Sequence, residues 1–225
     1  MKIKGKISIY IVFPFCLIIL TAGCISSTTQ EDVAAPTDDS LQSFDEFFES
    51  ETLDLSLSGE NINGAILLYQ GHGSLRITTA EEKVISIDPA GEGYDAPADL
   101  IWITHPHQDH TAIERIETQN PNSLIITHEE ALVDGKHKTF ELDFVTVEAV
   151  EAGNNPNHDI NICVGYILAL PDGISIYISE DTSKTEQMGK LAERNLDYAF
   201  FCSDGRYNMD YGGGYRVCHT CWCKA

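Results

Sequence analysis

A short histidine-rich stretch carries the strongest chemical signal in this 225-residue chain. Residues 104–110 read Thr-His-Pro-His-Gln-Asp-His, directly after the apolar run Leu-Ile-Trp-Ile over residues 100–103. Neutral imidazole and carboxylate are ligands that suit Zn²⁺ and, with more oxygen ligands, Mn²⁺ or Fe. Histidines that occur by chance in a polar loop scatter along a chain, and these do not. The stretch therefore predicts a metal site.

The apolar run explains how these side chains could meet. If residues 100–104 form a buried strand, His105 and His107 leave its end two residues apart and can point the same way. The turn that follows would bring Asp109 and His110 round to the same small volume. We therefore expect a strand that delivers four candidate ligands to one end of a sheet.

The pattern H-x-H-x-D-H at the end of an apolar strand resembles the signature of the metallo-β-lactamase superfamily. Flanking pieces are similar, by order and spacing, to the L-ascorbate-6-phosphate lactonase-like metal-dependent hydrolases: Gly-His-Gly-Ser-Leu-Arg-Ile at 71–77, Ile-Asp-Pro at 87–89, Gly-Tyr at 165–166 and Asp-Thr at 181–182. The resemblance runs over about residues 66–210. It implies an α/β fold, the four-layer αβ/βα metallo-β-lactamase sandwich, truncated here at its C-terminal edge.

The resemblance also implies a set of ligands for one or two divalent ions, with Zn²⁺ expected first and Mn²⁺ or Fe as alternatives. The first ion would be held by three histidines and the second by Asp109 and His110, with a carboxylate between the ions. Asp109 would also act in catalysis, by orienting a metal-bound hydroxide or shuttling its proton. The full expected set is His105, His107, Asp109, His110, His158 and Asp181.

Four other residues have less specific interpretations. His72 stands between two glycines. It is either a turn residue or part of the metal site, where it would bind the metal or contact a residue that does. Asp88, which precedes a proline, is either a turn residue or a hydrogen-bond partner for a ligand histidine. His128 and His137 are expected in exposed loops rather than at a metal.

The motifs together predict a metal-dependent hydrolase that uses a metal-bound hydroxide on an ester, lactone or phosphoester. The alternative is a non-catalytic or inactivated metal-binding surface lipoprotein. The expected substrate is a small molecule, and its identity does not follow from a fold resemblance. The formal net charge of −21, from 14 Lys and Arg against 35 Asp and Glu, argues against nucleic acid as a partner.

The N-terminus has the pattern of an exported lipoprotein. Three lysines precede an apolar run over residues 7–20, which is shorter than the about 20 residues that a transmembrane helix needs. Leu-Thr-Ala-Gly-Cys over residues 20–24 resembles a lipobox. It predicts a signal peptide over residues 1–23 and a lipid anchor on Cys24 at the outer face of the cell membrane. An ordinary cleaved signal or an uncleaved anchor is the alternative.

Three segments follow the signal peptide. Residues 24–55 are acidic and predict a flexible tether, and residues 56–210 predict the hydrolase domain, which is incomplete. Residues 211–225 form an aberrant tail, where the family continues with a helix and a strand bearing a last metal-binding histidine. A one-base change of frame near Asp210 is compatible with that missing segment, so we hypothesise a frameshift. With the tail that follows Asp210 in this sequence, the chain lacks that histidine and is expected to bind a second ion weakly.

The remaining patterns predict the elements that position the site. Helices are expected from Thr111 and after a capping box of the form Ser-x-x-Glu at residues 183–186. Cys163 and Cys202 lie in apolar runs and are expected to be buried thiols. The expected strands are residues 65–69, 74–78, 83–87, 123–127, 160–168 and 174–179, with paired strands over 140–150.

Overall fold

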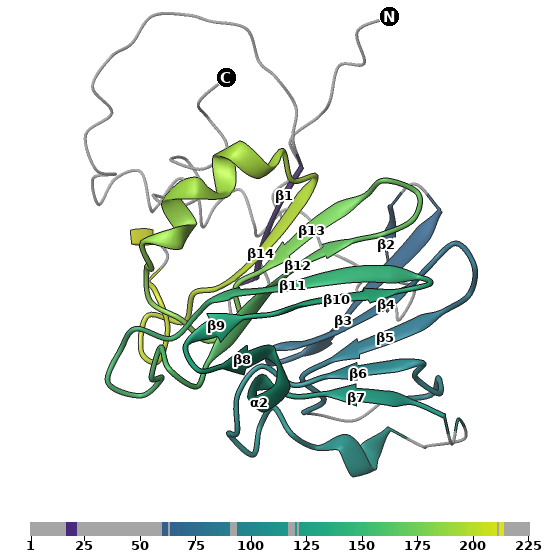
Figure 1. The fold of residues 1–225 in the computed structure, drawn as a ribbon, viewed down its shortest axis with the longest axis horizontal. Coiled ribbons are helices and arrows are strands. Elements are labelled where there is room, and N and C mark those ends of the chain that lie inside the picture. The colour runs from purple at the N-terminus through teal and green to yellow at the C-terminus, as the bar shows by residue number, and fades with distance from the viewer. Residues whose placement is uncertain are drawn as a thin grey trace, which may run out of the picture.

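The computed structural model describes residues 17–21, 60–62, 64–90, 94–116, 120, 122–210 and 212–213. Two six-stranded sheets are its main elements, and they pack face to face (Figure 1). A small two-stranded sheet lies beside them, made by β8 (Leu132–Val133) and β9 (Lys136–His137). The described residues are thus mostly β-structure with few helices.

The first sheet begins as an antiparallel meander and ends in parallel strands. Its order is β2 (Glu60–Ile62), β3 (Ala65–Gly71), β4 (Ser74–Thr78), β5 (Val84–Ile87), β6 (Leu100–Trp102) and β7 (Leu124–Ile126). The strands predicted over residues 65–69, 74–78 and 83–87 are confirmed and pair antiparallel in sequence order, and β5, β6 and β7 run parallel to one another. Their C-terminal ends therefore lie at one edge of the sheet, where Asp88 and the histidine-rich stretch follow β5 and β6.

The second sheet supplies the opposite side of the sandwich. Its order is β1 (Leu17–Thr21), β14 (Tyr198–Cys202), β13 (Ser175–Ile178), β12 (Val164–Ala169), β11 (Val145–Glu151) and β10 (Thr139–Leu142). The predicted pairing over residues 140–150 is confirmed by the β10–β11 hairpin. β13 and β14 run parallel, so the residues after both strands lie at the same edge.

The main hydrophobic core fills the space between the two sheets. Alternate residues of the strands face inward, and β11 shows this alternation along most of its length. Trp102 of the first sheet makes edge-on ring contacts with Tyr166 and Phe140 of the second, at centroid distances of 4.3 and 5.3 Å. These contacts join the strand that carries the histidine motif to the opposite sheet.

The outer layers differ from the expected sandwich because the helices are short. η1 (Ile113–Arg115) and η2 (Gln187–Arg194) are 3-10 helices, and they cover smaller apolar clusters on the outer faces of the two sheets. The predicted capping box at residues 183–186 is wrong. Ser183 donates its backbone N–H to Gly153 O and the Thr182 hydroxyl also donates to Gly153, so this segment is tied to a neighbouring loop.

A capping box does occur elsewhere, at a short helix that was not predicted. The helix α2 (His128–Ala131) begins after Thr127. The Thr127 side chain accepts a backbone N–H of the first turn, and the Glu130 side chain accepts the backbone N–H of Thr127. His128 opens this helix and His137 lies in β9, and both are half-buried. The expectation of exposed loops for these two histidines is therefore wrong, because both belong to regular elements and are half-buried.

The chain ends are described only in part. β1 lies within the predicted signal peptide and pairs antiparallel with β14. The predicted tether from residue 24 to 55, and the tail apart from residues 212–213, lie outside the described residues. Among the described helices, none has the length and apolar character needed to span a bilayer. Cys163 and Cys202 are free thiols, and Cys163 is buried as expected.

Candidate metal centre

The sequence-predicted ligands converge at the edge where strands of both sheets end. The histidine motif follows β6 of the first sheet, and Asp181 follows β13 of the second. His158 comes from the loop between β11 and β12, and its backbone N–H donates to the Asn155 side chain. The sandwich therefore gathers residues from distant parts of the chain at one site.

A first cluster consists of His105, His107 and His158, whose ring nitrogens lie within 4.8 Å of one another. Nε2 of His105 is 3.1 Å from Nδ1 of His107. His105 and His158 are buried, whereas His107 is exposed. Three imidazoles at this spacing can hold one tetrahedral ion and leave a position open.

The charge state of His105 suits a metal ligand. Burial, with the nearby positive charge of His110, lowers the pKa of His105 to about 3 despite the carboxylates around it. The ring is therefore neutral at neutral pH. Metals bind the neutral imidazole, so no proton needs to be displaced from His105.

Asp88 orients two of the histidines. Its carboxylate accepts hydrogen bonds from the backbone N–H of Thr104 at 2.8 Å and from the Thr104 hydroxyl. The same hydroxyl lies 2.8 Å from Nδ1 of His105, and Nδ1 of His110 lies 2.8 Å from Asp88 Oδ2. With Nδ1 occupied in both rings, Nε2 is left for a metal. These contacts favour the hydrogen-bond interpretation of Asp88.

A second cluster consists of His72, Asp109 and His110, again with ligand atoms within 4.8 Å of one another. Nε2 of His72 is 2.9 Å from Asp109 Oδ2. His110 is fully buried, whereas the Asp109 side chain is 57% exposed. The structure therefore places His72 beside two of the expected ligands of the second ion.

Asp181 lies between the two clusters. Its Oδ2 is 3.2 Å from Nε2 of His158 and 3.6 Å from Nε2 of His110. Burial alone would raise the pKa of Asp181, but the adjacent His110 and His158 outweigh burial and lower it. Asp181 is therefore an ionised carboxylate that approaches one histidine of each cluster, as a bridging ligand would.

His110 shows that the pocket fits a cation. Burial would lower the pKa of His110, yet the carboxylates of Asp88, Asp181 and Glu180 raise it to about 11. The protonated ring is thus the positive charge among these acids. Its Nε2 is buried and has no hydrogen-bond partner. A cation bound to Nε2 would satisfy this atom and replace the charge of the proton.

Two functional candidates in this region were missed. Asn208 donates from Nδ2 to Asp181 Oδ1 at 3.0 Å and so fixes the carboxylate between the clusters. Glu180 is buried at a positive φ of 48°, where the family has glycine, and burial beside Asp88 raises the pKa of its carboxyl group. The departure from the glycine of the resembled family was a sequence signal at Glu180, and nothing in the spacing pointed to Asn208.

A cavity of about 510 Å³ opens onto both clusters. One side is formed by residues of the clusters, including His107, Asp109 and Asp181, and the other by residues after β14, including Asp204 and Tyr207. His128 and His137 belong to none of the candidate ligand groups found among the described residues. The cavity gives a small molecule access to the candidate ligands.

Known proteins with similar sequences or structures point to one family. Residues 67–221 match the family model described as a β-lactamase superfamily domain. A curated UPF0173 metal-dependent hydrolase from Nitratidesulfovibrio vulgaris is 24% identical over 176 residues, which cover 64% of this chain and 70% of that protein.

Two solved structures share the fold. One is a proposed metal-dependent hydrolase from Parabacteroides distasonis, with a TM-score of 0.63 and 26% identity over 73% of this chain and 84% of that one. The other is Igni18, a metallo hydrolase from the archaeon Ignicoccus hospitalis, with a TM-score of 0.52 and 19% identity over 69% of this chain and 77% of that one. The second likeness shows the fold alone.

Proposed function

Because the chain belongs to the metallo-β-lactamase superfamily, we propose that this metal-dependent hydrolase cleaves a small ester, lactone or phosphoester. The observation that carries the proposal is the pair of ligand clusters, which share one cavity and have Asp181 between them. The similarity to two metal-dependent hydrolases, one curated and one of solved structure, supports the same class of reaction.

The donor atoms indicate how cations would be held. The three imidazoles of the first cluster suit Zn²⁺, and the carboxylate-containing second cluster suits Zn²⁺, Mn²⁺ or Fe. His105, His107 and His158 would hold one ion, Asp109 and His110 the other, and Asp181 would contact both. A bound divalent cation would lower the pKa of a water molecule and polarise an oxygen of the substrate.

The protein residues contribute orientation and proton transfer. Asp88 fixes His110 directly and His105 through Thr104, so both rings keep the direction that ligation requires. Asp109 lines the cavity with an exposed carboxylate. Burial would raise the pKa of Asp109, but His110 and His72 lower it, so Asp109 is ionised and can accept a proton from an attacking water.

The cavity has the size of a small-molecule site and an acidic lining. Its volume of about 510 Å³ is in the range of small-molecule sites. Asp109, Asp181 and Asp204 line it, and among the described residues no lysine or arginine does. Divalent cations held by Asp109 and Asp181 would offset these negative charges, so the lining accommodates carboxyl esters, lactones and phosphoesters alike.

Hydrolysis assays on the purified protein test the proposal. Matched carboxyl ester, lactone and phosphodiester substrates would be assayed before chelation, after chelation and after addition of Zn²⁺ or Mn²⁺. We expect a cation-dependent rate on at least one substrate and a loss of at least about 100-fold in His107→Ala, with His137→Gln as the control. Metal binding without cation-dependent turnover would contradict the proposal.

We also propose that the protein is exported and attached to the outer face of the cell membrane by a lipid on Cys24. The lysine-rich start, the apolar run and the lipobox-like residues 20–24 support this location. Removal of residues 1–23 would also remove β1 from the edge of β14. Intact mass measurement of membrane-derived protein would show a lipidated N-terminal cysteine, and a chain that retains residues 17–21 would contradict the proposal.

A further inference from the structure

We propose that His72 is a direct metal ligand, which completes a second cation site together with Asp109 and His110. This inference rests on the proposed metal dependence and extends it, since His72 is outside the ligand set expected from the family motifs. The ligand atoms of the three residues lie within 4.8 Å of one another. Two imidazoles and one carboxylate form a donor set that Zn²⁺ and Mn²⁺ accept.

His110 supplies an independent observation at the same place. Asp88 occupies Nδ1 of His110, which leaves Nε2 as the free ring nitrogen. This Nε2 is buried and makes no hydrogen bond, since its neighbour Asp181 Oδ2 is 3.6 Å away, and an unsatisfied buried polar atom is costly. The His72 and His110 ring centroids are 5.2 Å apart, so one cation could lie between the two rings.

The backbone around His72 is shaped for this approach. His72 has a positive φ of 57°, a conformation that costs free energy in a residue other than glycine. The Tyr69 hydroxyl donates a hydrogen bond of 2.8 Å to the His72 carbonyl, and a change of register in the β3–β4 pairing precedes the turn. These features hold the His72 side chain beside Asp109.

Gly73 shows how closely the turn packs on the metal centre. A Cβ atom at residue 73 would lie 2.8 Å from Cε1 of His110 and 2.8 Å from Oε2 of Glu180. The glycine is therefore needed for the backbone to pass against the ring of a candidate ligand. A turn required only to reverse the chain would have no reason to approach His110 this closely.

The inference changes the expected metal content. Without the histidine that the family carries beyond residue 210, the second ion was expected to bind weakly. With His72, the second site has three protein ligands from the described residues, and Asp181 is near. We therefore expect the chain as written to bind two cations.

Equilibrium dialysis against Zn²⁺, with metal analysis, tests the inference. The His72→Gln variant is informative because the glutamine amide can donate to Asp109, as His72 Nε2 can, but is a poor metal ligand. We expect two ions per chain in the wild type and one in His72→Gln. Loss of affinity at the second site should exceed the about 10–100-fold cost of losing an outer-shell partner.

The control and the contrary outcomes separate this inference from the proposed function. His137→Gln, in β9, should keep two ions. Two ions bound with unchanged affinity by His72→Gln would overturn the inference and leave the proposed function standing. No ions bound by the wild type would overturn both. If His72→Gln does not fold, His72→Asn replaces it, because asparagine tolerates a positive φ.

Discussion

Asp88 is a buried residue on which the positions of several others depend. It lies at a positive φ of 42° directly after β5, and its carboxylate accepts the Thr104 backbone N–H, the Thr104 hydroxyl and His110 Nδ1. Thr104 extends this control to His105. One carboxylate therefore sets the direction of a ring in each of the two clusters.

Replacement of Asp88 by asparagine should weaken metal binding by about 10–100-fold, because an amide keeps only one acceptor oxygen. It cannot accept from the Thr104 N–H at one oxygen and from His110 and the Thr104 hydroxyl at the other. Calorimetric titration of metal-free protein with Zn²⁺ measures the change. Asp197→Asn is a matched control, since Asp197 accepts the backbone N–H and hydroxyl of Ser175 in the same way.

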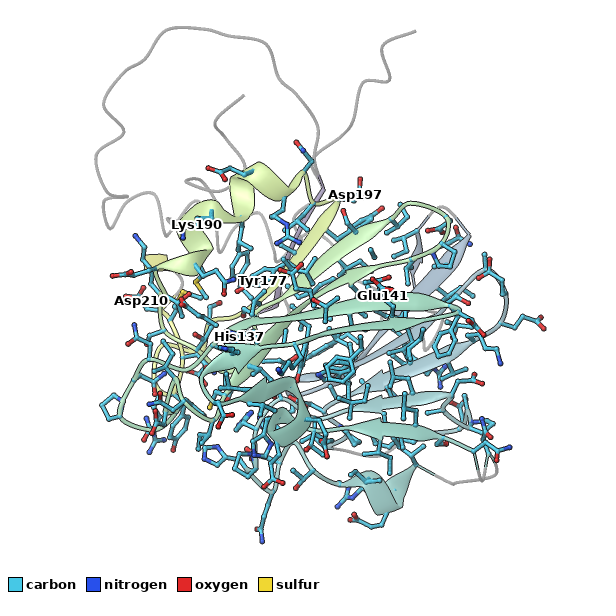
Figure 2. The ribbon with its side chains drawn as sticks, in the orientation of Figure 1. His137, Glu141, Tyr177, Lys190, Asp197 and Asp210 are labelled. Carbon is cyan, nitrogen blue, oxygen red and sulfur yellow. The ribbon has the colours of Figure 1, made fainter. Side chains whose placement is uncertain are left out.

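Asp197 directly precedes β14 (Figure 2) and belongs to neither ligand cluster. Its replacement should lower the free energy of unfolding by about 1–3 kcal/mol and leave the affinity for Zn²⁺ unchanged. Equal losses of metal affinity in both variants would show that Asp88 acts only through general stability.

At the scale of elements, the β3–β4 turn is sensitive to small changes. Gly73→Ala should lower the free energy of unfolding by about 1–3 kcal/mol, because the new methyl group would displace His110 or Glu180. It should also weaken metal binding. Gly189→Ala, in η2, adds a methyl group that meets nothing within 4 Å and should not destabilise the protein.

Urea denaturation and Zn²⁺ titration of both variants check this prediction. A Gly73→Ala variant with unchanged stability and metal affinity would mean that the turn can move away from His110 at little cost.

The packing of η2 on the second sheet includes an ion pair. Arg194 Nη1 donates to Glu148 Oε1 at 2.8 Å, and this hydrogen bond lowers the pKa of the Glu148 carboxyl group below 4.5. A carboxyl group with a lowered pKa in the folded state contributes stability above its unfolded pKa, and this contribution is lost as the pH falls through the folded value.

Glu148→Gln should therefore lower the free energy of unfolding by about 0.5 kcal/mol at neutral pH, since the pair is partly exposed. The difference from the wild type should shrink as the pH falls below 4.5. Urea denaturation over this pH range measures it. If the difference in free energy of unfolding between the wild type and Glu148→Gln grew toward low pH, the ion pair would not be its cause.

Sequence patterns identified the strands and the histidine motif because those signals are local. Alternating or apolar runs predicted β3, β4, β5 and β13, and the motif directly follows β6. The sequence offered a role at the site as one of two interpretations for His72 and for Asp88, and it could not choose between them because the contacts depend on how β3, β4, β5 and β6 align. The Asn208–Asp181 contact depends on the two loops after β13 and β14.

The helices were predicted poorly for a related reason. A helix was predicted after the Ser-x-x-Glu pattern at residues 183–186, and η2 does begin at Gln187, but no side-chain capping bond forms because this segment bonds to Gly153 instead. A matching Thr-x-x-Glu pattern at residues 127–130 does cap α2 and was available in the sequence. A capping pattern is local, whereas the competing bonds join segments that are distant in the chain.

For the whole molecule, metal binding should be linked to stability. The candidate ligands come from loops of both sheets, so unfolding separates them and only the folded chain presents the full set. A free cation at 100 times its dissociation constant should raise the free energy of unfolding by about 2.7 kcal/mol. Denaturation with Zn²⁺ and with chelator measures this, and identical curves would show that no site forms on folding.

Reactivation of metal-free protein tests the central claim most directly. Zn²⁺ or Mn²⁺ would be added in steps to the chelated, dialysed wild type, and bound cation and rate of hydrolysis would be measured on the same samples. We predict that the rate rises from background in proportion to the cation bound and that chelator reverses it. Hydrolysis by metal-free protein at the full rate, or full cation binding without hydrolysis, would contradict the account.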